Sequence, residues 1–399
     1  MFIYKIARNE QIGDIMENKI KIVCVGIGGY ASVYWKALFA DTEGDFEIVG
    51  AVDPFPEGSP YYEEIKTRGI PLYSNMEDFY REHSADLAII TTPIHLHTRQ
   101  TLFALEHGSN VLCEKPLSGV STDAEVIEKR AAELGKFVMI GYQWSYAPAI
   151  LGLKSDVLSG KLGAPVSLKT RILWPRKKEY FTRGSGWAGK LKAKDGTVIN
   201  DSVAANACAH YIHNMLFVCG KEYLAAEPLC VKADLIRVNA IENFDNATIS
   251  FELENGAKCL FVAAHSSNIN RNPMFDYEFE NATVKYDENT KDIVAYFKNG
   301  EEKHYGNPFS GGSDGKKARV AINGCKAQDF KPVCSPYTAA AHTRCIEAVQ
   351  TFPIYEVKEE FIKENEGLLY VDGLAEAMTE CYAEGKMLSE TEAFKKWVK

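Results

Sequence analysis

A glycine-rich turn follows a short apolar run near the start of the chain and precedes a helical stretch. It reads Gly26, Ile27, Gly28, Gly29, Tyr30 and Ala31. This order fits the spacing G-x-G-x-x-[G/A], in which the first glycine allows a tight turn and the second lets the backbone approach a pyrophosphate. The start of the helix also offers N–H groups to an anion. The turn therefore predicts a phosphate site for a dinucleotide, although glycine-rich turns occur in many folds.

A carboxylate follows the next apolar run. Asp53 comes directly after Phe46 to Val52, and Pro54 follows with no Arg or Lys close by. A carboxylate at this place accepts hydrogen bonds from the ribose hydroxyls and repels a 2′-phosphate. The sequence therefore favours NAD over NADP as the cofactor. The alternative is a solvated aspartate beside an incidental turn.

Polar residues also follow two later apolar runs, at the points where strands are expected to end. They are Thr91, Thr92, Pro93 and His97 after the first run, and Glu114 and Lys115 after the second. In open parallel sheets, ligands bind outside the carboxyl ends of the strands, so these side chains are expected beside the cofactor. His95 and His97 have no third ligand at zinc spacing, so no metal site is predicted.

These motifs resemble those of the Gfo/Idh/MocA family, named for glucose–fructose oxidoreductase, inositol dehydrogenase and a rhizopine-catabolism protein. Thr92-Pro93 with His97, followed by Glu114-Lys115-Pro116, carries most of the resemblance, which covers nearly the whole chain. The resemblance implies an NAD(P)-dependent oxidoreductase that acts on CH–OH groups. It also implies that Lys115 reaches between the nicotinamide and the substrate.

A later helical stretch places three polar side chains on one face. Asn206, His210 and His213 are four and three residues apart, amid Ala, Leu, Met and Phe. The family has D-x-x-x-H-x-x-D here, so the resemblance implies a catalytic role for His210, oriented by Asn206, and substrate contact for His213. Because both family aspartates are replaced, either Lys115 or His210 is expected to take the substrate proton. The alternative is a set of ordinary core or surface residues.

Aromatic and arginine side chains crowd the segment from Trp174 to Gly189. Aromatic faces stack on the C–H surfaces of sugars, and arginine binds hydroxyls or carboxylates through two hydrogen bonds. An ordinary loop with packed tryptophans is the alternative. Asp201-Ser202, shortly before the helix, is either an N-cap or a further hydroxyl-binding carboxylate. The side chains expected to contact a carbohydrate-type substrate are Tyr142, Gln143, Arg183, Trp187, Asp201 and His213.

Strand-like and helix-like segments alternate through the first third of the chain. Near-continuous apolar runs separated by helical spacing predict a parallel sheet that is buried on both faces. We expect an α/β fold that begins with a Rossmann-type NAD(P)-binding domain over 17–143.

The pattern changes from about Pro165, where apolar and polar residues alternate. Asn255-Gly256 and Asn299-Gly300 predict hairpins with type I′ turns. We expect 144–399 to form an α+β domain for substrate binding and oligomerisation, with a large, mostly antiparallel open sheet. Helical spacing returns over Tyr337–Val349 and Leu368–Met387.

The composition is that of an ordinary globular protein. Of 399 residues, 46% are hydrophobic, and 54 acidic against 45 basic side chains give a formal charge of −9. Nucleic-acid surfaces need clustered Lys and Arg, and a bilayer span needs about 20 apolar residues, so neither partner is expected. The ten cysteines form no C-x-x-C pair and no signal-peptide core is recognisable, which indicates reduced thiols and a cytoplasmic location. Met16 is a second candidate start.

Four aromatic residues of the expected antiparallel sheet, Tyr277, Phe279, Tyr286 and Tyr296, are candidates for an exposed apolar face. Sheets with such a face often pair between subunits, and the resemblance implies the same. We therefore expect a homo-oligomer, either a dimer or a tetramer, formed through this sheet.

Three functions fit these residues. The first is NAD-dependent hydride transfer between the nicotinamide and a secondary alcohol of a sugar, polyol or glycoside. The second is NAD-dependent glycoside cleavage through a transient 3-keto sugar. The third, motivated by the missing aspartates, is a non-catalytic NAD-binding module.

Overall fold

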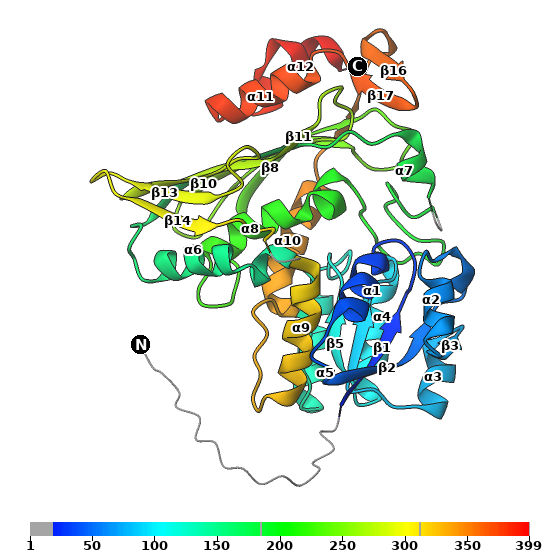
Figure 1. Cartoon of the computed structure of the whole chain (residues 1–399). Coiled ribbons are helices and arrows are strands. Elements are labelled where there is room, and N and C mark those ends of the chain that lie inside the picture. Colours follow the sequence, from blue (N-terminus) through cyan, green and yellow to red (C-terminus); the bar gives the residue numbers. More distant parts are fainter. Residues whose placement is uncertain (1–18, 184–185, 311–312, 399) are drawn as a thin grey trace.

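The computed structural model describes residues 19–183, 186–310 and 313–398, and it contains two large sheets (Figure 1). The first third of the chain builds one sheet, in the lower half of the view, and the second sheet lies above it. The predicted alternative start at Met16 lies outside the described residues. Among helices in the described ranges, none is long and apolar enough to cross a bilayer.

The first sheet has six parallel strands in the order β3-β2-β1-β4-β5-β6. The strands are β1 (Ile20–Val25), β2 (Phe46–Val52), β3 (Leu72–Tyr73), β4 (Leu87–Ile90), β5 (Asn110–Cys113) and β6 (Val138–Ile140). This is the doubly wound order, which reverses between β1 and β4. The predicted Rossmann-type sheet is confirmed.

Helices of the same region pack around this sheet. They are α1 (Ala31–Ala40), α2 (Tyr62–Thr67), α3 (Met76–Glu82), α4 (His97–Glu106) and α5 (Asp123–Glu133). A further helix, α9 (Ser313–Lys326), comes from much later in the chain and packs along α1. The predicted domain division at residue 143 stays a prediction, because α9 contributes buried side chains to the core of the first sheet.

The crevice at the reversal of strand order requires a glycine. Val25 at the end of β1 pairs with Ile90 at the end of β4, which brings the next residues of both strands together. Gly26 has φ +81°, and a Cβ there would lie 3.0 Å from the Thr92 methyl carbon and 3.1 Å from the Thr91 carbonyl carbon. A side chain at position 26 would therefore push the two strand ends apart.

The second sheet has nine strands in the order β14-β13-β12-β11-β7-β10-β9-β8-β15. The strands are β7 (Pro165–Leu173), β8 (Leu229–Arg237), β9 (Asn246–Glu252), β10 (Lys258–Ala264), β11 (Arg271–Phe279), β12 (Ala282–Tyr286), β13 (Ile293–Phe297), β14 (Glu302–Gly306) and β15 (Ile354–Glu356). Neighbours are antiparallel except for the β7–β10 and β8–β15 pairs. The expected mostly antiparallel sheet is confirmed.

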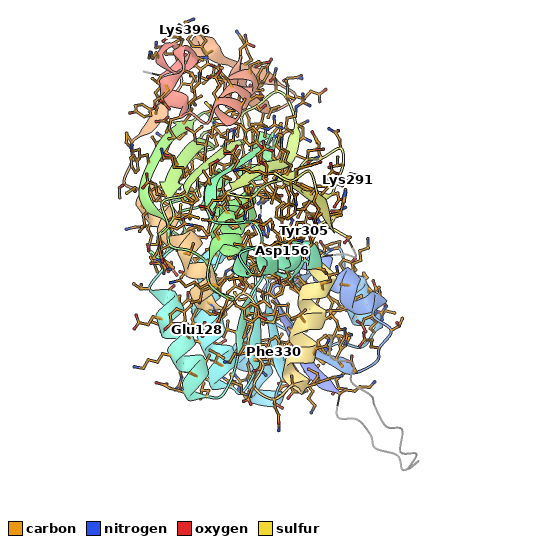
Figure 2. All side chains as sticks on the ribbon, turned by 90° about the vertical axis from the view of Figure 1, so that its left-hand side faces the viewer. Glu128, Asp156, Lys291, Tyr305, Phe330 and Lys396 are labelled. Atoms are coloured by element: carbon orange, nitrogen blue, oxygen red, sulfur yellow. The ribbon has the colours of Figure 1, made fainter. Side chains whose placement is uncertain are left out.

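Helices cover both faces of this sheet. On the side of the first sheet lie α6 (Pro148–Leu158), α8 (Ala209–Cys219) and α10 (Pro336–Val349), whereas α11 (Leu374–Glu384) and α12 (Glu392–Trp397) lie on the opposite side (Figure 1). The hydroxyl of Tyr305 in β14 donates a 2.8 Å hydrogen bond to Asp156 in α6, and Figure 2 shows the two residues side by side. The edge of the sheet is thus fastened to the inner helices.

The aromatic face predicted for self-association is mostly internal. Tyr277, Phe279 and Tyr286 are buried in the core that the sheet shares with α6 and α8, and Tyr296 alone of the four is exposed. The opposite face of the sheet packs Leu260 and its neighbours against α11 and α12. The assignment of this aromatic set to an open face was wrong, because helices of the same chain cover both faces.

Both predicted hairpins form, but the type I′ prediction was wrong. Gly256 and Gly300 have φ +82° and +88°, whereas neither preceding asparagine has a positive φ. Instead, the side-chain oxygen of Asn255 accepts a hydrogen bond from the N–H of Ala257, and Asn299 does the same for Glu301. The asparagines therefore shape longer loops through their side chains.

The last predicted helix was wrong at its start. Leu368–Val371 forms strand β17, which pairs with β16 (Ile362–Asn365), and the helix begins at Leu374. The predicted helix over Tyr337–Val349 is confirmed by α10.

Helix α9 is held to the first sheet by buried and half-buried charges. Lys317 is fully buried, and its Nζ lies 2.5 Å from a carboxylate oxygen of Glu114 and 3.2 Å from the carbonyl oxygen of Gly141. Arg319, two residues later, donates two 2.8 Å hydrogen bonds to the carboxylate of Asp45. Removing one partner of a buried ion pair leaves an uncompensated charge, which costs more than the pair contributes.

Replacing Lys317 with Met is expected to lower the free energy of unfolding by about 3 kcal/mol, because the Glu114 carboxylate stays buried without this cation. Urea denaturation followed by circular dichroism measures the change. The matched control is Lys331→Met, since Lys331 is exposed and lies in no ion pair among the described residues. Equal midpoints for the two variants would contradict the prediction.

Candidate functional site

The glycine turn, Asp53 and Thr91 meet at the crevice between β1 and β4. The Asp53 carboxylate accepts hydrogen bonds from the backbone N–H groups of Ile27 (3.0 Å) and Phe55 (2.9 Å). The Thr91 hydroxyl donates a 2.7 Å hydrogen bond to the Gly26 carbonyl. A Cβ at Gly28 or Gly29 would meet no atom within 4 Å. The outer side of the turn therefore leaves room for a ligand to approach the backbone.

Tyr30, at the start of α1, is 40% exposed, and its hydroxyl donates a 3.1 Å hydrogen bond to the side-chain oxygen of Gln143. This contact joins the glycine turn to the segment that follows β6. A residue predicted to contact cofactor and a residue predicted to contact substrate thus lie next to each other.

His97 links the two strand-end motifs. Its ring is buried, Nδ1 lies 2.9 Å from the carbonyl oxygen of Pro116, and Nε2 lies 2.8 Å from that of Thr92. Burial is the main cause that lowers the pKa of this histidine. With both ring nitrogens engaged, His97 is placed to position Thr92-Pro93 against the turn after β5 rather than to bind a ligand itself.

Glu114 lies in a buried ionic cluster that sequence patterns did not reveal. Besides the Lys317 ammonium, its carboxylate accepts hydrogen bonds from the Tyr34 hydroxyl (2.5 Å) and the Lys115 N–H (3.1 Å). Tyr34 stands four residues after Tyr30, on the same side of α1, a spacing that could have indicated it. Lys317 is 203 residues from Glu114, and no local signal indicates it.

Lys115 reaches from the end of β5 to Asn206, which precedes α8. Its Nζ donates hydrogen bonds to the backbone oxygen of Asn206 (2.8 Å) and to the side-chain oxygen of the same residue (2.9 Å). Burial lowers the pKa of Lys115 to about 8; the Lys317 charge also lowers it, whereas Glu114 opposes the shift. Asn206 lies in a π-helical turn, Val203–Ala207, directly before α8. Local π-helical geometry of this kind is frequent at functional sites.

His210 lies one turn further along, in α8. The ring is 8% exposed, and its Nδ1 has no hydrogen-bond partner in the described part of the chain. Burial lowers the pKa of His210 well below its usual value, and the charges of Lys115 and Lys317 act in the same direction. His210 is therefore a neutral imidazole near pH 7, close to the Lys115 ammonium.

Asp201 lies just before the π-helical turn. One carboxylate oxygen accepts a 2.5 Å hydrogen bond from the N–H of Gly189, and the other, although buried, has no partner among the described residues. Burial raises the pKa of Asp201 to about 6. The side chain that caps the turn is Ser202, which accepts a 3.1 Å hydrogen bond from Ala205. The N-cap predicted for Asp201-Ser202 is therefore confirmed at Ser202, which leaves the Asp201 carboxylate out of the cap.

His213 and Tyr142 stack on each other behind the His210 ring. Their ring centres are 3.8 Å apart with an 18° interplanar angle, and both side chains are buried. His213 Nε2 lies 3.0 Å from the Ser145 hydroxyl, and the Tyr142 hydroxyl bonds to Nδ1 of His342 at 2.8 Å. This packing makes His213 and Tyr142 supports of the site. His342, which joins them from α10, was missed because only the tertiary fold brings it there.

The segment after β7 carries the remaining predicted side chains. The Arg183 guanidinium lies 3.5 Å from the centre of the Tyr180 ring and 5.9 Å from that of Trp187. Arg183 is exposed and Trp187 is half-buried. Within the described ranges, no group of three or more His, Cys, Asp and Glu side chains is arranged to hold a metal ion.

The family model for the Gfo/Idh/MocA oxidoreductases, described as an NAD-binding Rossmann fold, matches residues 20–142. A glucose-6-phosphate 3-dehydrogenase of Bacillus subtilis is 28% identical over 152 residues, which cover 38% of this chain and 42% of the relative. An inositol 2-dehydrogenase of Rubrobacter xylanophilus is 32% identical over 150 residues, 37% of this chain and 42% of the relative. The matched segments thus span less than half of either relative.

The second domain is matched by solved structures. The crystal structure of the WlbA dehydrogenase from Bordetella pertussis, in complex with NADH and UDP-GlcNAcA, covers 84% of this chain and 96% of its own with a TM-score of 0.68. Identity is 20%, so this likeness concerns the fold. The sequence match lies in the first sheet and includes the glycine turn and the Glu-Lys-Pro motif. Residues 20–142 are therefore similar to the NAD-binding Rossmann fold of the Gfo/Idh/MocA oxidoreductases.

Proposed function

We propose that this protein is an NAD-dependent oxidoreductase that acts on a secondary alcohol of a sugar, polyol or glycoside. The observation that carries the proposal is the position of Lys115, whose half-buried ammonium extends from the end of β5 to Asn206, one helical turn before His210. Relatives named for ring positions of glucose 6-phosphate and inositol support a ring hydroxyl as the reacting group.

The residues at the crevice fit the cofactor. The glycine turn would hold the pyrophosphate, and Asp53 would accept hydrogen bonds from the ribose hydroxyls. NAD supplies the hydride acceptor when bound. The Tyr30 hydroxyl and the side-chain oxygen of Gln143 lie 3.1 Å apart and connect the glycine turn to the segment after β6.

Lys115 and His210 are suited to move the alcohol proton. A lysine with a pKa of about 8 is partly neutral at physiological pH, so its Nζ can accept a proton and return it. The Asn206 oxygens orient that nitrogen. His210 Nδ1 and the second Asp201 oxygen, both without a protein partner in the described ranges, are suited to bind substrate hydroxyls.

We further propose a cytoplasmic location and a homo-oligomer. All ten cysteines are free, and most are buried, which suits a reducing compartment. For self-association, the support is the exposed Tyr296 on β13 and the exposed Val166 on β7.

Replacing Lys115 with Ala is expected to lower kcat by about 100-fold or more, since a positioned general base contributes this much, while the Kd for NAD changes little. Absorbance of NADH measures turnover, and fluorescence titration measures the Kd. Lys129→Ala, on the exposed face of α5, is the control and should behave as the unmodified protein. Unchanged turnover in Lys115→Ala would remove this lysine from the mechanism.

Replacing Asp53 with Asn should weaken NAD binding about 10-fold and reduce the preference of the protein for NAD over NADP. The variant keeps a hydrogen-bond acceptor but loses the charge that repels a 2′-phosphate. Titration with both cofactors gives the ratio of the two Kd values. A ratio that does not move would exclude Asp53 from cofactor selection.

Alcohol oxidation should depend on pH through Lys115. Its neutral form is the base, so kcat/KM should rise about tenfold per pH unit below pH 8 and level off above that value. The pKa of His210 is too low for its protonation to produce this limb. A profile that is flat from pH 6 to 9 would contradict the assignment.

A further inference from the structure

Two arginines in the segment after β7 share one aromatic ring. The guanidinium of Arg176 lies 5.1 Å from the centre of the Tyr180 ring, and that of Arg183 lies 3.5 Å from the same centre. Each also approaches a tryptophan: Arg176 is 5.6 Å from the Trp174 ring centre, and Arg183 is 5.9 Å from that of Trp187. Two cations are thus gathered over a small aromatic surface.

Neither guanidinium forms an ion pair with a carboxylate of the described residues. Within the described ranges, no carboxylate lies within 4.0 Å of Arg176 or Arg183. Other arginines of the chain do have such partners; Arg237 lies 2.5 Å from Glu356, and Arg319 lies 2.8 Å from Asp45. Contacts with aromatic faces offset only part of the repulsion between two neighbouring cations. An anion bound between the two guanidinium groups would remove this repulsion.

The arginine pair belongs to the same region as the proton-transfer groups. The N–H of Arg176 donates a 3.0 Å hydrogen bond to the carbonyl of His265, at the end of β10. The Trp174 ring centre lies 5.8 Å from that of Tyr211, the residue after His210.

Asp201 connects the other end of the segment to this region. Its carboxylate accepts a hydrogen bond from the N–H of Gly189, which lies two residues after Trp187. Burial raises the pKa of Asp201, and the charges of Arg183 and Lys115 oppose part of that shift. Arg183 and Lys115 therefore both lie close enough to Asp201 for their charges to act on its carboxylate.

We infer that Arg176 and Arg183 form a subsite for an anionic group on the sugar, a carboxylate or a phosphate, which holds the reacting alcohol beside Lys115 and His210. Guanidinium groups bind both kinds of oxyanion through paired hydrogen bonds. Trp174 and Trp187 offer apolar faces for the sugar C–H surface between the charge and the alcohol. The inference rests on the proposed oxidoreductase function and narrows its substrate class to acidic sugars.

The test compares anionic and neutral sugars of the same ring. Glucuronate, galacturonate and glucose 6-phosphate are measured against glucose and galactose, by NADH formation and by thermal shift with NAD present at matched ionic strength. We expect an anionic sugar to be preferred about 10- to 100-fold, as hydrogen bonds to a charged group allow. Preference for the two uronates indicates a carboxylate site, and preference for glucose 6-phosphate indicates a phosphate site.

Arg176→Gln and Arg183→Gln should each reduce this anionic-to-neutral ratio about tenfold or more. Arg81→Gln, on the exposed side of α3, is the matched control and should leave the ratio unchanged. Equal binding of anionic and neutral sugars by the unmodified protein would overturn the subsite, as would variants that lower both equally.

The two proposals fail separately. Arginine-dependent binding of an anionic sugar without NADH formation would keep the subsite and contradict the oxidoreductase. If the protein oxidises neutral sugars in a reaction that requires Lys115 and is unchanged in both arginine variants, the oxidoreductase function stands and the anionic subsite is contradicted.

Discussion

The site depends on the half-buried ammonium of Lys115. Removing Lys115 from water is unfavourable unless its N–H groups find acceptors, and both acceptors come from Asn206, 91 residues later in the chain. The contact therefore fixes how the end of β5 faces the π-helical turn before α8. The same burial that requires the contact also lowers the pKa of Lys115 to about 8, so the packing of the domains and the chemistry of the lysine have one cause.

Contacts of the two neighbouring residues in the chain, Glu114 and Pro116, restrain the position of Lys115. Glu114, its neighbour in the chain, is held by Lys317 of α9 and Tyr34 of α1, while His97 ties Pro116 to Thr92. These contacts leave the motif little freedom to move. His210 and Asp201 keep polar atoms without protein partners in the described ranges, and Arg176 and Arg183 lie over the Tyr180 ring without a carboxylate within 4.0 Å among the described residues. Lys115 is therefore held by rigid contacts and lies near polar groups that are available to bind a ligand.

The second sheet shows why the residue pattern alone predicted an exposed aromatic face that is in fact mostly buried. Alternation of polar and apolar residues correctly predicted antiparallel strands, but it cannot reveal what covers each face. Helices α6 and α8 cover one face and α11 and α12 cover the other, so Tyr277, Phe279 and Tyr286 stabilise the core of the subunit.

Local patterns in the sequence determined the glycine turn, the alternating strands and helices of a Rossmann-type sheet, and the strand ends that carry Glu114 and Lys115, because each depends on neighbouring residues and on strand or helix periodicity. The same patterns pointed to His210 and Asn206 with help from the family resemblance. Only the tertiary structure decided that Lys317 and His342 support the site, that Ser202 rather than Asp201 caps the turn, and that His213 stacks inside the core. These outcomes depend on side chains brought together from as far as 203 residues apart, and packing, not local spacing, selects such partners.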